Sequence, residues 1–148
     1  MSTLRKRIAA PIALVIALAI APALSGCSIS DIIQGATGGA VDVGGTSVPD
    51  GFPAEVPLVD GTVQFGGSVG DDTGRVFNVT IKVTGGNPYD GIKAALEGAG
   101  FTDNGTIGGS SAEGGTLIYT NDNWGVLVVV GKDGNDFVVN YTVTSTNQ

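Results

Sequence analysis

The sequence predicts an α+β fold, a single small domain in which a mostly antiparallel sheet carries one helix on one face, in the element order β-β-α-β-β-β. Five stretches of strand length and strand composition occur between residues 62 and 144, and turn-forming residues separate most of them. Only the stretch from Asn87 to Gly100 combines helical spacing with a start and a stop signal. We expect the domain to span residues 48–148.

The first part of the domain mixes prolines with apolar residues. Pro49–Pro53 and Val56–Leu58 favour an extended segment that packs across a core, because proline cannot donate a hydrogen bond inside a sheet. Thr62–Phe65 and Arg75–Val83 are then predicted as strands. In the second of them, apolar and mostly polar residues alternate, which indicates one buried and one exposed face.

The helix is predicted from its two ends and its apolar stripe. Asn87 and Pro88 are typical of an N-cap and a first helical residue, and Gly100 followed by Phe101 is typical of a Schellman ending. The apolar residues recur at steps of three and four, namely Tyr89, Ile92, Leu96 and Ala99. Two glycines inside the helix weaken it by about 1 kcal/mol each relative to alanine, so the helix should depend on docking against the sheet.

Three closely spaced strands follow a glycine-rich loop at Asn104–Gly115. They are predicted at Thr116–Thr120, Trp124–Val130 and Phe137–Thr144. The short connections between them have turn composition, which indicates an antiparallel meander.

The middle strand of this meander is apolar on both faces, because Leu127 and Val129 alternate with three further valines. Such a strand is usually central and covered on both sides, and one helix cannot cover both. We expect the proline-rich segment Pro49–Val59 to cover the second face. The glycine-rich loop or another molecule are the alternatives, and Leu127 and Val129 are therefore a candidate interaction face.

The N-terminal 26 residues have the three parts of an export signal. Arg5–Arg7 form a basic region, Ile8–Leu24 an apolar region, and small residues precede Cys27. The alternative, an uncleaved membrane-spanning helix, is disfavoured because the apolar region is at the short end of the spanning range and prolines at positions 11 and 22 interrupt it.

The residues Leu24-Ser25-Gly26-Cys27 resemble a bacterial lipobox. The resemblance implies cleavage before Cys27 and a diacylglycerol on its sulfur, hence a palmitate-type lipoprotein held on the extracytoplasmic face of the cell membrane. Two acyl chains suffice for stable anchoring. The C-terminal 95 or so residues resemble, in general character and without a diagnostic motif, the small domains of many actinobacterial lipoproteins.

Residues 27–47 are predicted to be the lipidated cysteine and a flexible, glycine-rich tether. Removal of the signal leaves four basic residues against 14 acidic ones, a net charge of −10. Such a chain is repelled by nucleic acid, which excludes that class of partner.

Few residues suited to catalysis occur in the sequence. It contains no histidine, and Cys27 is its only cysteine. Gly66–Gly70 matches G-x-S-x-G, but without a histidine it is interpreted as a hairpin loop. The acidic turns lack the spacing of an EF-hand calcium loop, so no metal or other cofactor is expected. We expect a non-enzymatic lipoprotein that binds or assembles with an envelope component, and the alternative is a small-molecule or cation-binding module.

Overall fold

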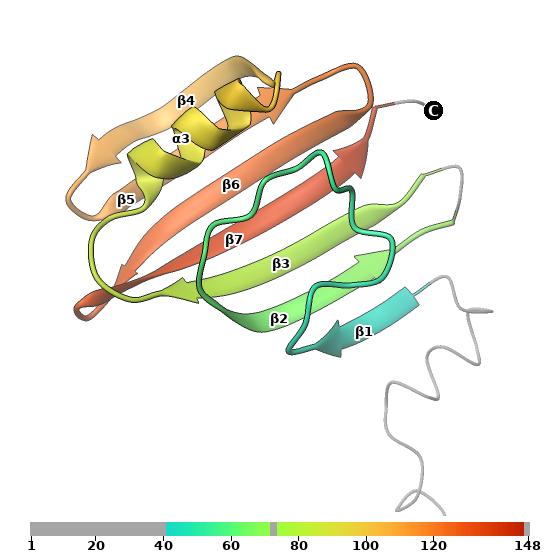
Figure 1. The fold of residues 1–148 in the computed structure, drawn as a ribbon, viewed down its shortest axis with the longest axis horizontal. Helices are drawn as coiled ribbons and strands as arrows, with labels where there is room; N and C mark the ends of the chain where they lie inside the picture. The colour runs from blue at the N-terminus through green and yellow to red at the C-terminus, as the bar shows by residue number, and fades with distance from the viewer. Residues whose placement is uncertain (1–40, 72–73, 147–148) are drawn as a thin grey trace, which may run out of the picture.

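The structure of the protein, a computed structural model, describes residues 41–71 and 74–146, which form one antiparallel sheet of seven strands and one helix (Figure 1). The strands are β1 (Val41–Gly45), β2 (Thr62–Val69), β3 (Val76–Val83), β4 (Thr102–Ser111), β5 (Gly114–Thr120), β6 (Trp124–Asp133) and β7 (Asp136–Ser145), and the helix is α3 (Tyr89–Gly98). Across the sheet their order is β1-β2-β3-β7-β6-β5-β4. The predicted mostly antiparallel sheet with one helix is confirmed.

Two strands were not predicted from the sequence. β1 lies in the stretch interpreted as tether, and β4 lies mostly in the stretch interpreted as a glycine-rich loop. The glycines near β1 permit close packing: a Cβ on Gly44, whose φ is +49°, would overlap the ring of Phe65, and one on Gly66 would overlap the carbonyl oxygen of Ser47. Residues 27–40 of the predicted tether, including Cys27, and the signal lie outside the described residues.

The core lies on one face of the sheet, where side chains of four strands are at most 5% exposed. These are Phe77, Val79 and Ile81 of β3, Leu117 and Tyr119 of β5, Val126, Val128 and Val130 of β6, and Phe137, Val139, Tyr141 and Val143 of β7. Helix α3 covers the β4–β5 side of this face, and residues 46–61, which we call the strap, cover the β2, β3 and β7 side (Figure 1).

The helix has the predicted C-terminal end, whereas its N-cap is Pro88, one residue after the predicted Asn87. At the start, the side-chain oxygen of Asn87 accepts a hydrogen bond of 3.0 Å from the backbone N–H of Tyr89. At the end, the N–H of Phe101 donates to the carbonyl of Leu96 at 3.0 Å, and Gly100 has a φ of +86°. Both features of a Schellman ending are thus present. No helix within residues 41–71 and 74–146 is long and apolar enough to cross a membrane.

The strap is fixed to the same face as the helix. The rings of Phe52 and Phe77 meet edge to face with centroids 5.6 Å apart, and the N–H of Val59 donates to the hydroxyl of Tyr141 at 3.1 Å. The prediction that Pro49–Val59 packs across a core is confirmed. The prediction that it covers Leu127 and Val129 is wrong, because alternation along β6 directs those two side chains to the opposite face.

Candidate interaction surface

The face of the sheet opposite α3 and the strap is not covered by any described segment, and we call it the open face. It carries five of the six large apolar side chains that are exposed among the described residues. They are Phe65 (43% exposed), Val69 (57%), Val76 (37%), Leu127 (38%) and Val129 (43%). The two residues predicted as a candidate interaction face therefore belong to a larger apolar set, which also includes residues of β2 and β3.

Strand register aligns four of these five apolar residues in two rows across the sheet, and Leu127 lies between the two rows, opposite Thr142. In one row, Phe65 of β2 and Val129 of β6 stand on either side of Thr80 and Asn140. In the other row, Val69 of β2 and Gly125 of β6 stand on either side of Val76 and Thr144. The open face is thus apolar on β2 and on β6, with a mostly polar strip on β3 and β7 between them.

The middle of the polar strip is a closed hydrogen-bond network of Asn78, Thr80, Asn140 and Thr142. The amide nitrogen of Asn78 donates to the side-chain oxygens of Asn140 and Thr142, both at 3.1 Å. The amide nitrogen of Asn140 donates to Asn78 at 3.0 Å and to Thr80 at 2.9 Å. A side-chain amide has two N–H groups, so every N–H group of Asn78 and Asn140 donates to a partner within the sheet.

A hollow of about 260 Å³ lies on the open face beside Leu127. It arises because Gly125 has no side chain and stands between Thr120 and Thr144 in the register. A Cβ at this glycine would meet its nearest neighbours at 3.9 Å, which is ordinary van der Waals contact. The hollow is therefore formed by a missing side chain in an otherwise regular sheet, and its lining is mostly apolar.

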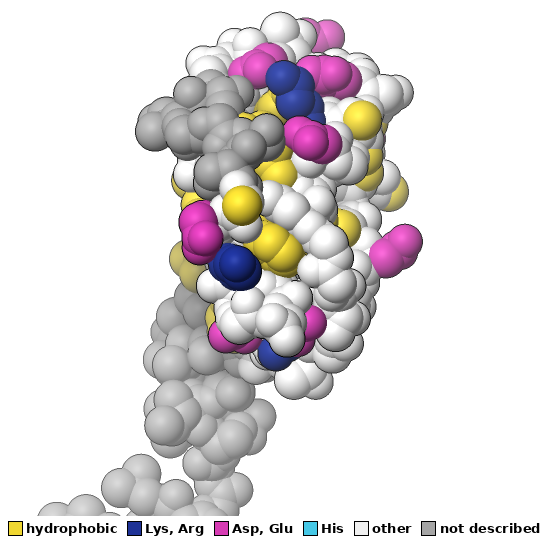
Figure 2. Space-filling view, turned by 90° about the vertical axis from the view of Figure 1, so that its left-hand side faces the viewer, with side chains coloured by type: hydrophobic (Ala, Val, Ile, Leu, Met, Phe, Trp, Pro, Cys, Tyr) yellow, Lys and Arg dark blue, Asp and Glu magenta, His cyan; other side chains and the backbone are white. Residues whose placement is uncertain are grey.

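The charged residues Lys82, Asp133 and Asp136 lie together at one end of the open face. The ammonium group of Lys82 lies 3.3 Å from a carboxylate oxygen of Asp133 and 3.4 Å from one of Asp136. Hydrogen bonds to these two carboxylates raise the pKa of Lys82, and the bond to Asp133 has the largest effect. The two rows described above contain no charged residue. In the end-on view of Figure 2, each basic side chain lies beside acidic ones, and hydrophobic side chains appear between them.

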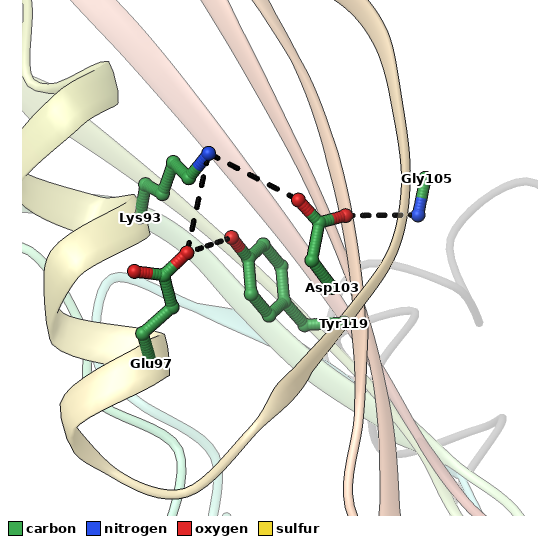
Figure 3. A network of polar contacts seen from close by, with 5 residues as sticks. All are labelled: Lys93, Glu97, Asp103, Gly105 and Tyr119. Atoms are coloured by element: carbon green, nitrogen blue, oxygen red, sulfur yellow. Dashed lines mark hydrogen bonds and ion pairs between the residues drawn. The ribbon is translucent and has the colours of Figure 1, made fainter.

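A second polar cluster joins α3 to β4 and β5 (Figure 3). The ammonium group of Lys93 lies 4.0 Å from carboxylate oxygens of Glu97 and Asp103, and the hydroxyl of Tyr119 donates to Glu97 at 3.1 Å. Burial, followed by the bond to Glu97, raises the pKa of Tyr119, so its hydroxyl stays protonated at neutral pH. This arrangement anchors the helix and presents no activated nucleophile.

A crevice of about 50 Å³ separates the strap from α3, with Tyr141 at its base. Burial raises the pKa of Tyr141 to about 12, and the N–H of Val59 donates to its hydroxyl. The crevice has room for a water molecule or two and not for a larger ligand.

The sequence motifs considered for catalysis do not form a site. Gly66–Val69 continues β2, and Ser68 is only 7% exposed, so the predicted hairpin loop begins only at Gly70 and no nucleophile elbow forms. Within the part of the chain that the structure describes, no three acidic, histidine or cysteine residues lie close enough together to hold a metal ion.

The open face could be predicted only in part from the sequence. Alternation along each strand predicts that Asn78 and Asn140 lie on the face opposite their apolar neighbours. That the two side chains meet follows only from the β3–β7 register, because the residues are 62 positions apart in the sequence. Comparison with known proteins gives no match: no protein-family model, no curated protein and no solved structure matches this chain.

Proposed function

We propose that this protein is a lipoprotein of the cell envelope, anchored through Cys27 on the extracytoplasmic side of the membrane, that has no enzymatic role and assembles with a protein partner through its open face. The observation that carries the proposal is the pattern of that face, with five exposed apolar side chains and its charged residues confined to one end. Apolar surface of this extent on one side of a soluble domain is typical of an interaction site.

The anchoring part of the proposal rests on the lipobox and on the place where the sheet begins. Thirteen residues separate Cys27 from Val41, the first residue of β1. A flexible chain of thirteen residues has a mean reach of about 20 Å. The sheet would then lie close to the membrane surface, within reach of other envelope proteins.

The shape of the open face favours a macromolecule over a small ligand. The hollow beside Gly125 is open and, at about 260 Å³, lies below the range of about 300–1,000 Å³ that ligand pockets usually occupy. The amides of Asn78 and Asn140 have no N–H left to offer a polar ligand. A small-molecule or cation-binding module, the alternative from the sequence, is therefore supported less well.

The proposal is tested by photocrosslinking in intact source cells. A photoreactive amino acid replaces Leu127 in the full-length protein, and the control carries it in place of Val48, which is equally exposed at 38% but lies outside the sheet. We expect a discrete protein adduct from position 127 and not from position 48. Equal adduct patterns from the two positions would overturn the proposed role of the open face.

The anchor is tested separately with Cys27→Ala. Wild-type protein should incorporate a labelled fatty acid and sediment with membranes, and the variant should remain an unlabelled, longer precursor. Wild type and variant of equal mass, neither of them labelled, would overturn the lipoprotein assignment.

A further inference from the structure

We infer that the partner on the open face is a second copy of this chain, packed face to face in a two-layer sandwich. This inference deepens the proposed function and rests on it, because it names the protein that covers the open face. Four properties of the face support it: the alignment of its rows, the closure of its polar network, its area and the position of its charges.

The rows are self-complementary under a two-fold axis that runs parallel to the strands between β3 and β7. Such an axis places β2 of one copy over β6 of the other and keeps each row facing the same row of its partner. Phe65 then faces Val129. In the other row Val69, the most exposed of these apolar side chains, faces Gly125 and the hollow beside it. A projecting side chain thus meets a hollow twice, once from each copy.

The polar strip can be buried in such a sandwich at little cost. Under the same axis, β3 lies over β7, so the network of Asn78 and Asn140 faces its own copy. Burying an amide is costly when its hydrogen bonds to water are lost without replacement. Here all four amide N–H groups are already bonded within the sheet. The strip therefore acts as a dry spacer between the apolar residues of β2 and those of β6.

The area of the face suits a stable dimer. The axis lies in the middle of six of the seven strands, with β1, β2 and β3 on one side of it and β7, β6 and β5 on the other. With strands about 4.8 Å apart and about 27 Å long for eight residues, these six strands present about 700 Å² per copy. Two copies would bury about 1,400 Å², which lies within the range of about 1,200–2,000 Å² for specific interfaces.

The net charge of the chain favours a neutral contact surface, and the direction of the chain favours this axis. A net charge of −7 before cleavage opposes the approach of two copies least across a neutral surface, and the two rows contain no charged residue. A two-fold axis parallel to the strands also brings the Val41 ends of both copies to the same end of the sandwich. Both tethers then lead to one membrane, whereas an axis across the strands would send them in opposite directions.

The test is crosslinking between two differently tagged full-length copies in the same cells. One copy carries Phe65→Cys and the other Val129→Cys, and a short bis-maleimide joins thiols that face each other. The control pairs Val48→Cys with Val129→Cys, and a pair of wild-type copies reports any free Cys27 thiol. We expect a mixed-tag product at least about ten-fold above the control, since facing sheets pack about 10 Å apart and their side chains meet.

A charge exchange provides a second measurement that does not depend on cysteine. Phe65→Glu alone should reduce co-purification of the two tagged copies at least about ten-fold, because it buries an unpaired charge at the interface. Adding Val129→Lys to the same chain should restore co-purification, since each glutamate then faces a lysine. Circular dichroism checks that both variants are folded, as expected for substitutions at exposed positions.

The outcomes separate this inference from the proposed function. A mixed-tag product together with rescue supports the second copy as partner. No mixed-tag product above the control overturns the inference, and if position 127 still photocrosslinks a different protein, the proposed function stands without it. If position 127 gives no specific adduct either, both are overturned. An adduct within one chain, between position 127 and the N-terminal segment, also overturns both.

Discussion

Asn78 and Asn140, on neighbouring strands 62 residues apart in sequence, donate to each other's side-chain oxygens at 3.1 and 3.0 Å. The two amides are diagonal neighbours on the open face, since the register places Asn78 opposite Thr142 and Asn140 opposite Thr80. The reciprocal pair fixes both side chains in one orientation. It is the reason why a strip of polar residues can lie in the middle of a surface that we propose to be buried.

The first prediction concerns this pair. Asn78→Ala and Asn140→Ala should each lower the free energy of unfolding by about 1 kcal/mol, because each leaves a part-buried partner without its hydrogen bond. The double variant should cost clearly less than the sum of the two single variants, since the lost bonds are shared. Urea unfolding of the full-length protein measures all three. Strictly additive losses would contradict the reciprocal geometry.

The second prediction compares two glycines of the sheet. A Cβ at Gly66 would overlap the carbonyl oxygen of Ser47, whereas one at Gly125 would have only ordinary contacts. Gly66→Ala should therefore lower the free energy of unfolding by about 1–3 kcal/mol, and Gly125→Ala should change it by no more than about 0.5 kcal/mol. Thermal unfolding compares the two directly, and similar melting temperatures would show that the approach of Ser47 to β2 is misplaced.

The sequence predicts an element of this fold well where the residues that determine it lie within the element itself. The sequence places the helix to within a residue, because Asn87 and Gly100 lie next to its two ends. β1 and β4 were missed because their many glycines were interpreted as flexibility, whereas at Gly44 the glycine permits close packing against Phe65. The cover of Leu127 was mispredicted for a different reason, since the path of the strap depends on tertiary contacts that strand alternation does not encode.

The third prediction tests the face of α3. Leu96 is fully buried, so Leu96→Ala should lower the free energy of unfolding by about 2–5 kcal/mol. Lys93 lies on the partly exposed side, 4.0 Å from two carboxylates, and Lys93→Ala should cost no more than about 0.5 kcal/mol. Denaturant midpoints of the two variants provide the comparison, and equal shifts would mean that the docked face of the helix is incorrectly assigned.

The fourth prediction concerns alkaline pH. Burial raises the pKa of Tyr141 from 10.0 to about 12 in the folded protein, so folding opposes ionisation of its hydroxyl. The resulting stability is fully present below about pH 10 and is lost as the pH rises from 10 to 12, on the order of 2 kcal/mol. Urea unfolding at pH 8, 10 and 11.5 follows this loss.

The matched variant for this measurement is Tyr141→Phe, which cannot ionise. At pH 8 it should be less stable than wild type by about 1 kcal/mol, because the N–H of Val59 loses its acceptor. Its stability should then decline less steeply above pH 10. A decline as steep as that of wild type would show that Tyr141 does not contribute to the alkaline transition.

The most direct measurement of whether the open face is covered in the envelope is thiol labelling of Val129→Cys in intact cells, with Val48→Cys as the reference. The side chains of the two native residues are similarly exposed in the isolated chain, at 43% and 38%. If a partner covers the open face, a membrane-impermeant maleimide should react with the cysteine at position 129 at least about ten-fold more slowly than with the one at position 48, and the two should react alike after denaturation. Equal labelling rates in intact cells would contradict the proposal that the open face is an interface.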